Sequence, residues 1–316
     1  MIKIYKKEGD VLTVVPAPQK DCWINIAPPF DMDQLESLAD KLNIPFSYIV
    51  DCIDQYERSR YEKQEDAKLI VINTPVLNEG VDLEDEATYI TIPVGIILIP
   101  DMIVTVCSVQ NPMMEWFEKN VLKNILPHER SMFVIKIFER NVYYFLHYLR
   151  EVNKRISQIE KELNYSSRNQ ELNKLLHLQK ALIYFVNDIR ANEMVLLKIQ
   201  RTDFLDLGED TASKELFQDV IIDNSQALEM ASVYSNILGN MMGAFASIIS
   251  NNLGHVVNRL TAVTIALMLP TLVAGIYGMN VDLPFQHQAH AFTIVVLISI
   301  LTTIIFVIYF RKKRWL

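Results

Sequence analysis

Two long uncharged apolar segments near the C-terminal end constrain this chain most. Residues 260–277 (LTAVTIALMLPTLVAGIY) and residues 291–310 (AFTIVVLISILTTIIFVIYF) contain no Asp, Glu, Lys or Arg. A helix of 18 residues is about 27 Å long, close to the thickness of the hydrocarbon core of a bilayer. A buried core helix is an alternative for the first segment, which Pro270 and Gly275 interrupt. A helix that is apolar on every face has no place in water, so the pair predicts a helical hairpin in a membrane.

The charges around these segments predict their orientation. Arg259 precedes the first segment, and the linker 278–290 carries one formal charge, Asp282. A basic cluster follows the second segment: Arg311, Lys312, Lys313 and Arg314. Because basic residues stay on the cytoplasmic side, we expect a multi-pass protein of the cell (inner or plasma) membrane with both termini in the cytoplasm. The N-terminal stretch MIKIYKKEGD lacks an apolar core segment, so we expect no cleavable signal peptide.

The first ~125 residues mix strand-like and helical patterns. IKIY and VLTVV resemble a hairpin, and strands are predicted over 67–75, 88–100 and 103–108. A helix is predicted from Asp31, its N-cap, with Leu35, Leu38 and Leu42 on one stripe. The three cysteines form no CxxC pair, so we expect reduced thiols in a cytosolic domain.

No catalytic motif stands out in this chain. Only nine of its residues are glycine, and it has no GxGxxG, GxxxxGK[ST], nucleophile elbow or HExxH. We therefore do not expect an enzyme, and we disfavour nucleotide-dependent pumping. The net charge is −8, and we expect no nucleic-acid partner.

From about residue 130 onward the apolar spacing is that of helices. Leu149, Val152, Ile156, Ile159 and Leu163 recur three and four residues apart. A second run follows the break at NYSSRN (164–169): Leu172, Leu175, Leu182, Val186, Ile189 and Leu196. This pattern predicts an antiparallel helical hairpin.

The segment from Glu209 to Tyr277 has no convincing helix breaker before Pro270. Residues 203–229 hold eight acidic residues and one lysine, whereas residues 230–258 hold no charged residue. Uncharged Ala, Ser, Met, Gly and Asn suit close packing of identical helices around a narrow wet axis. A two-stranded structural stalk is the alternative, but it would need a stronger Leu/Ile seam.

These observations predict an α+β membrane protein. We expect an N-terminal cytosolic α/β domain (1–128), an antiparallel helical hairpin (129–208) and a very long stalk and pore helix. That helix comprises a cytosolic stalk (209–258) and a first, pore-lining transmembrane helix (259–277). An extracytoplasmic loop (278–290), a second transmembrane helix (291–310) and a basic cytosolic tail (311–316) complete the chain.

The first transmembrane segment ends at Gly278-Met279-Asn280 rather than at a charged residue. If several copies surround an axis, Asn280 contributes a ring of neutral carbonyl oxygens at the outer end, and Gly278 lets the backbone turn. Mg²⁺ prefers oxygen neighbours and loses its water reluctantly, and neutral amides can bind its hydration shell. An ordinary helix C-cap is the alternative explanation.

The wider pattern resembles the CorA family of magnesium channels. YGMN (277–280), the short linker, one further span and the basic tail carry the resemblance, together with WINIAPP (23–29) and YERSRYEKQED (56–66). The resemblance implies a homopentamer in a lipid bilayer with passive Mg²⁺ entry. It also implies that Gly278, Met279 and Asn280 form the outer selectivity element.

The resemblance also implies which residues line the pore. The hydrophobic constriction falls on Val257, Leu260 and Met268, with Thr261 and Thr271 as polar lining residues. Where members of that family commonly carry an inner asparagine, this chain has Gly254. Asn251, three residues earlier, or Asn258, four residues later, lies near the same face and could substitute for it.

Regulation by cytosolic Mg²⁺ is implied as well, with metal bound between subunits. Asp219 matches the stalk position, and Asp223 lies one turn further on. Candidate partners lie in the run EGVDLEDE (79–86): Asp82, Glu84, Asp85 and Glu86. An ordinary solvated acidic surface is the alternative explanation of that run.

Two other functions stay open. His287 and His290 in the outer linker favour a Zn²⁺, Co²⁺ or Ni²⁺ transporter of the same family, because imidazole suits these metals. A membrane-anchored scaffold or sensor would conduct no ions, and it leaves the uncharged 230–258 stretch unexplained.

Overall fold

A computed structural model describes residues 1–8, 11–78, 87–120, 129–165, 169–280, 284 and 290–313. The chain divides into two compact units, Met1–Asn240 and Met241–Leu316, and the boundary falls inside one long helix. The predicted residues Asp82, Glu84, Asp85, Glu86, His287 and Arg314 lie outside the described part.

The N-terminal unit is built on a seven-stranded sheet with the order β2-β1-β3-β7-β6-β5-β4. The strands are β1 (Ile2–Glu8), β2 (Val11–Val14), β3 (Cys22–Ile26), β4 (Arg60–Gln64), β5 (Ala67–Leu77), β6 (Tyr89–Ile99) and β7 (Met102–Cys107). Only β3 and β7 pair in parallel; the other neighbours are antiparallel. The predicted strands at 67–75, 88–100 and 103–108 are confirmed as β5, β6 and β7.

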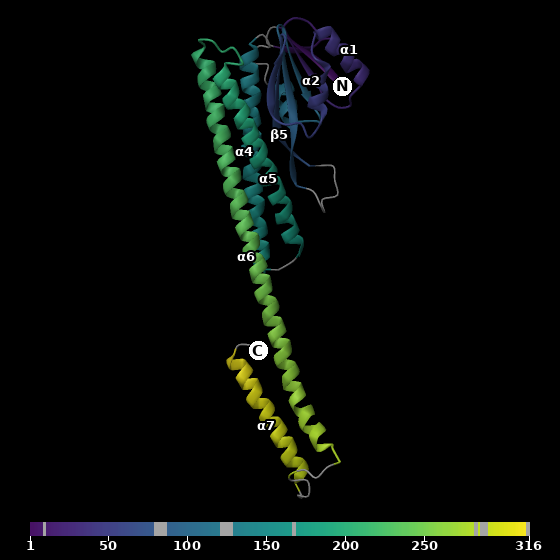
Figure 1. Cartoon of the computed structure of the whole chain (residues 1–316), viewed down its shortest axis with the longest axis vertical. Coiled ribbons are helices and arrows are strands. Elements are labelled where there is room, and N and C mark those ends of the chain that lie inside the picture. The colour runs from purple at the N-terminus through teal and green to yellow at the C-terminus, as the bar shows by residue number, and fades with distance from the viewer. Residues whose placement is uncertain are drawn as a thin grey trace. The chain divides into compact units, whose positions relative to one another are not determined.

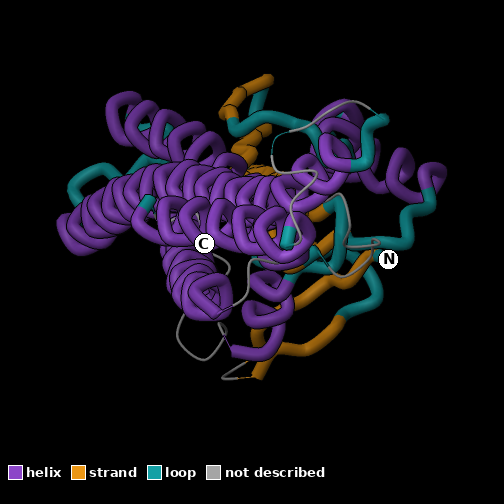
Figure 2. Tube along the Cα trace, turned by 90° about the horizontal axis from the view of Figure 1, so that it is seen from below, coloured by secondary structure: helices purple, strands orange, loops and turns teal. Residues whose placement is uncertain are grey.

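Both faces of this sheet are buried. Along β5, Ile70 and Ile72 belong to the core on one face, and Leu69 and Val71 belong to the core on the other, as alternation along a strand requires. Helices α1 (Met32–Leu42) and α2 (Phe46–Ile53) cover the second face. The first face is covered by α3 (Pro112–Asn120) and the longer helices (Figures 1 and 2). The fold is therefore a sheet between two helical layers.

The predicted start of α1 is confirmed. The Asp31 carboxylate accepts a hydrogen bond of 3.3 Å from the Gln34 N–H, and Asn43 ends the helix in the left-handed region at φ 52°. Leu35 and Leu38 are buried on the stripe that the spacing predicts.

The predicted helical hairpin is confirmed as α4 (Arg130–Tyr165) and α5 (Asn169–Thr202). Leu149, Val152, Ile156 and Ile159 are buried on α4, and Leu175, Leu182, Ile189 and Leu196 are buried on α5. These buried residues belong to the two apolar series whose spacing predicts the helical hairpin.

Pro93 leaves the opposite residue of β5, Asn73, to form hydrogen bonds with the helical hairpin. Pro93 faces Asn73 in the β5–β6 register and has no N–H to donate. The Asn73 carbonyl accepts hydrogen bonds from the Asn141 side chain (3.0 Å) and the Asn192 side chain (2.8 Å). The Asn73 N–H donates to the Asn192 side chain at 2.9 Å. Asn192 therefore joins α5 to the middle of strand β5.

Helix α6 (Thr211–Tyr277) is 67 residues long, and α7 (Ala291–Lys312) follows it. Both are long and apolar enough to cross a membrane, which agrees with the predicted spans. In the second unit α7 lies beside the C-terminal part of α6 (Figure 1). Ala262 and Phe310 are buried in this unit, and an apolar cavity of about 650 Å³ lies between the helices.

Candidate functional site: the exposed seam and outer end of α6

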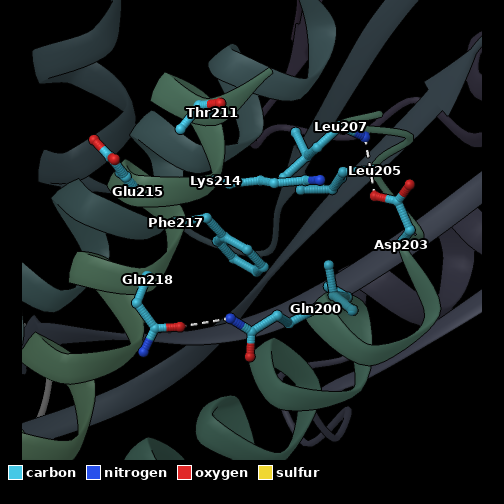
Figure 3. A pocket seen from close by; sticks show the side chains of 10 residues that line it. Gln200, Asp203, Leu205, Leu207, Thr211, Lys214, Glu215, Phe217 and Gln218 are labelled. Carbon is cyan, nitrogen blue, oxygen red and sulfur yellow. Dashed lines mark hydrogen bonds between the residues drawn. The ribbon is translucent and has the colours of Figure 1, made fainter. Parts of the chain in front are cut away.

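The N-terminal end of α6 is anchored to α5. The connector turns through left-handed residues at Asp203, Asp206 and Gly208. Figure 3 shows the cavity of about 290 Å³ beside it, where the Gln200 amide donates to Gln218 at 2.6 Å and the Leu207 N–H donates to Asp203 at 3.0 Å. The start of α6 is therefore fixed against the end of α5.

Asp210 caps the start of α6. Its carboxylate accepts hydrogen bonds from the Ser213 side chain and N–H, and these bonds lower the pKa of Asp210. The capped turn leads directly into the segment that carries Asp219 and Asp223.

The rotation of α6 places Asp219 and Asp223 on its free side. Phe217, Val220 and Asn224 are buried on the opposite side, where the Asn224 side chain donates to the Ile189 carbonyl at 3.2 Å. Both aspartates are exposed and lie one turn apart. Among the described residues no group of three His, Cys, Asp or Glu side chains could hold a metal ion. Within the described part of the chain, the two acids are therefore exposed and belong to no closed metal site.

A seam of small and hydroxyl-bearing residues runs along the membrane segment of α6. Val257, Thr264, Thr271 and Gly278 repeat at intervals of seven, and so do Gly254, Thr261, Met268 and Gly275. All eight are exposed in the single chain. A Cβ atom added at Gly254 or Gly275 would meet nothing within 4 Å. This face is free to receive neighbouring helices or water.

The three seam threonines bond to their own helix. The hydroxyls of Thr261, Thr264 and Thr271 donate to the carbonyls of the residues four positions earlier, at 2.8, 2.8 and 3.1 Å. Each hydroxyl hydrogen is used in this way, so the oxygen lone pairs remain as acceptors on the seam. Oxygen acceptors suit the water shell of a hard cation.

The other predicted pore residues lie beside this seam. Leu260 immediately precedes the seam residue Thr261, and Asn258 immediately follows Val257. Asn251 lies seven residues before Asn258, on the same side of the helix. Leu260 and Asn251 are exposed, and Asn258 is half-buried. The sequence reasoning missed Thr264 and Gly275, although continuing the heptad count from Val257 and Met268 would have found both.

Helix α6 ends just before the predicted selectivity residues. The Gly278 N–H donates to the Ala274 carbonyl at 2.9 Å, and the Met279 N–H donates to Ile276 at 3.2 Å. Gly278 is not in the left-handed region; a Cβ there would lie 3.3 Å from the Ala274 oxygen. Glycine therefore relieves crowding rather than enabling a left-handed turn. Asn280 follows, exposed.

The basic cluster lies at the C-terminal end of α7. Arg311 and Lys312 occupy its last turn, where cations stabilise the helix dipole. The Lys313 N–H donates to the Tyr309 carbonyl at 3.0 Å. These three side chains are exposed at the end of the helix, as a cluster at a membrane surface would be.

The sequence profile of one protein family, described as CorA-like Mg²⁺ transporter protein, matches residues 19–312. The chain belongs to the CorA family. Membership of a transporter family confirms the prediction that this chain is not an enzyme. It also confirms the sequence resemblance and the prediction of a membrane protein with two candidate spans.

Individual relatives agree with the CorA assignment. The cobalt/magnesium transport protein CorA of Methanocaldococcus jannaschii is 27% identical over 308 residues, which cover 93% of this chain and 91% of that protein. The magnesium transport protein CorA of Helicobacter pylori is 26% identical over 257 residues, or 80% of this chain and 78% of that protein.

Solved structures share the fold. The complete structure of the CorA magnesium transporter from Methanocaldococcus jannaschii superposes with a TM-score of 0.83 at 23% identity, covering 100% of this chain and 99% of that one. The ZntB cytoplasmic domain of Vibrio parahaemolyticus has a TM-score of 0.61 at 13% identity and covers 80% of this chain and 97% of its own. The predicted α+β membrane fold with its long helix is thereby confirmed.

Proposed function

We propose that this chain forms a passive Mg²⁺ uptake channel as a homopentamer, with α6 of each subunit lining the pore. The observation that carries the proposal is the seam that ends at Gly278, Met279 and Asn280. This seam is exposed in the single chain, its glycines carry no side chain, and its threonines supply oxygen acceptors. Closed rings of identical subunits place such a face around a common axis.

The outer end of the pore selects the ion in this proposal. Asn280 of each copy presents a neutral amide oxygen to the hydrated dication, and Gly278 and Met279 hold that residue at the mouth. Amide oxygens accept hydrogen bonds from the water shell of Mg²⁺ without removing it. Uptake then follows the ion gradient and the membrane potential.

The closed state of the proposed channel rests on apolar rings. Val257, Leu260 and Met268 are exposed in the single chain, by 51%, 67% and 63%, and rings of such side chains close a narrow pore by dewetting. Thr261 and Thr271 supply polar steps on the same seam. Asn251 or Asn258 supplies the inner polar ring that Gly254 lacks.

Cytosolic Mg²⁺ closes the channel in this proposal. Asp219 and Asp223 of one subunit share a metal ion with acidic residues of the neighbouring subunit: Asp82, Glu84, Asp85 and Glu86. Clustered carboxylates repel one another until a dication neutralises them. Loss of the ion would therefore loosen the ring of subunits and open the gate.

The orientation in the membrane follows from the flanking charges. Arg259 and the basic cluster at Arg311, Lys312, Lys313 and Arg314 stay in the cytoplasm, and the linker 278–290 faces outward. Both termini are then cytoplasmic, and the sheet domain is exposed to the Mg²⁺ concentration that it senses.

A second candidate cargo is Co²⁺ or a related transition metal. It is favoured by the name of the relative from Methanocaldococcus jannaschii, a cobalt/magnesium transport protein, and by His287 and His290 in the linker. Uptake of Mg²⁺, Co²⁺ and Zn²⁺ by liposomes that contain the purified chain separates these cargoes.

The decisive variant for Mg²⁺ transport is Asn280→Ala. We expect Mg²⁺ flux into liposomes to fall at least about tenfold, because the loss of one charge-assisted hydrogen bond per subunit removes about 1.5–3 kcal/mol of ion stabilisation. Asn187→Ala, at an exposed position on α5, is the matched control and should conduct normally. Unchanged selectivity and flux in Asn280→Ala would refute the proposed role of the outer ring.

A further inference from the structure

A groove between the last turns of α4 and the first turns of α5 has the properties of a small-molecule site. Its volume is about 530 Å³, inside the range of about 300–1,000 Å³ that ligand sites occupy. Ile159 and Leu178 supply apolar surface, and Thr88, at the entry to β6, borders the groove. It is built from the sheet domain and hairpin alone, so it does not involve the membrane segment of α6.

The charged side chains that line this groove are mostly cationic. Arg155 and Lys174 line it together with one acid, Glu162. Within the described residues, neither cation forms a salt bridge with a carboxylate. The Arg155 guanidinium carbon lies 5.4 Å from the centre of the Tyr89 ring. This cation–π contact orients the guanidinium and leaves its N–H donors available.

One residue that lines the groove is a histidine, one ring nitrogen of which is unpaired in the described part of the chain. His177 lines the groove and is only 9% exposed. Its Nδ1 is buried and, among the described residues, has no hydrogen-bond partner. Buried polar atoms are nearly always paired with protein, water or ligand, so the imidazole beside the groove has hydrogen-bonding capacity that this part of the chain does not use.

We propose that this groove binds a small anion that carries a phosphate group. Guanidinium and ammonium groups donate strong hydrogen bonds to phosphate oxygens, and a histidine adds a third polar contact. The apolar surface at Ile159 and Leu178 would accept an organic portion of the ligand. A bare divalent cation is the wrong ligand, because Arg155 and Lys174 would repel it. This site is therefore separate from the acidic residues on α6.

The experiment measures binding to the full chain in detergent by isothermal titration calorimetry. The probes are inorganic pyrophosphate and adenosine monophosphate, each without added metal. We expect saturable binding of one ligand per chain, weakened about tenfold or more by Arg155→Gln and by Lys174→Gln. Glu162→Gln should strengthen binding, because it removes the one carboxylate of the groove.

Lys161→Gln is the matched control. Lys161 is an exposed lysine of α4 that does not line the groove, so its loss should change affinity less than twofold. Tighter binding of the nucleotide than of pyrophosphate would identify a phosphorylated metabolite, and the reverse would identify free phosphate. The proposal is overturned if neither probe binds, or if Lys161→Gln weakens binding as much as Arg155→Gln does. Ion flux is measured separately, so neither result depends on the channel proposal.

Discussion

At the scale of single residues, Asp188 is a half-buried acid without a cationic partner among the described residues. Its carboxylate accepts hydrogen bonds from the Asn73 side chain, at 2.8 Å, and from the Thr91 hydroxyl. Burial raises the pKa of Asp188 above its usual range, and the two hydrogen bonds only partly oppose this shift.

The sign of the resulting pH dependence follows from linkage. An acid whose pKa rises on folding binds its proton more tightly in the native state. Asp188 therefore adds to stability below its unfolded pKa, and this contribution is lost as the pH rises through the folded pKa. We expect the thermal midpoint of the wild type to fall, relative to that of Asp188→Asn, as the pH rises above the ordinary aspartate pKa of about 4.

Thermal unfolding in detergent at a series of pH values tests this expectation. Thr91→Val removes one hydrogen bond to the carboxylate and should move the transition to higher pH. A difference between wild type and Asp188→Asn that stays constant over the whole range would contradict the assignment.

At the scale of elements, the join between α5 and the sheet depends on Asn192. Asn192→Ala should lower the free energy of unfolding by about 1–3 kcal/mol, because it leaves the buried Asn73 N–H without its acceptor, whereas the Asn73 carbonyl keeps its bond from Asn141. Chemical unfolding followed by circular dichroism measures the change. Asn187→Ala, at an exposed position five residues earlier, should have almost no effect, and equal losses in both variants would refute the special role of Asn192.

Elements with a strong periodic pattern could be predicted from the sequence, and irregular or short ones could not. The continuous apolar stretches of β5 and β6 predict buried strands, and the apolar residues spaced three and four apart in α4 and α5 predict helices. The edge strand β4 (Arg60–Gln64) is mostly charged and depends on pairing with β5. Helices α2 and α3 have only 8 and 9 residues, too few for a clear period. The parallel contact of β3 with β7 joins residues 80 positions apart, which local patterns do not encode.

The candidate site was predictable where its spacing is regular. Val257, Thr261, Met268 and Thr271 lie on the exposed seam, and their spacing can be read from the sequence. Their role in a pore stays a prediction. Leu260, Asn251 and Asn258 lie beside the seam. The sequence pattern could not predict this, because it does not fix how the helix is rotated toward its neighbours. The acidic partners in 79–86 stay a prediction, as they lie outside the described residues.

At the scale of the whole molecule, the single chain leaves one face of α6 without a partner. Gly275 lies on this face, and a Cβ there would contact nothing within 4 Å among the described residues. Gly275→Leu should therefore leave each subunit folded. If α6 helices pack around a pore, the variant should lose at least about tenfold in flux, because overpacking a close helix contact costs about 1–3 kcal/mol.

Light scattering of the detergent-solubilised protein and liposome flux test this prediction together. Val263→Leu, which adds volume to the same helix at an exposed position off the seam, is the control. A Gly275→Leu variant with the wild-type mass and wild-type flux would show that this seam does not face other subunits or the ion path.

The proposed regulation belongs to the assembly, because among the described residues Asp219 and Asp223 have no third His, Cys, Asp or Glu with which to hold a metal ion. The double variant Asp219→Ala, Asp223→Ala should keep conducting when internal Mg²⁺ is raised to millimolar levels, whereas the wild type closes. Glu229→Ala, an exposed acid elsewhere on α6, is the control. Normal closure of the double variant would remove these aspartates from the gating proposal.

The threonine hydroxyls of α6 have a consequence for anions. Thr261, Thr264 and Thr271 have each committed their only hydroxyl hydrogen to a backbone carbonyl. A chloride or phosphate ion entering along this face would meet lone pairs and methyl groups but no hydrogen to replace its lost water. If this seam lines the ion path, its threonines would favour cations over anions without carrying a charge of their own.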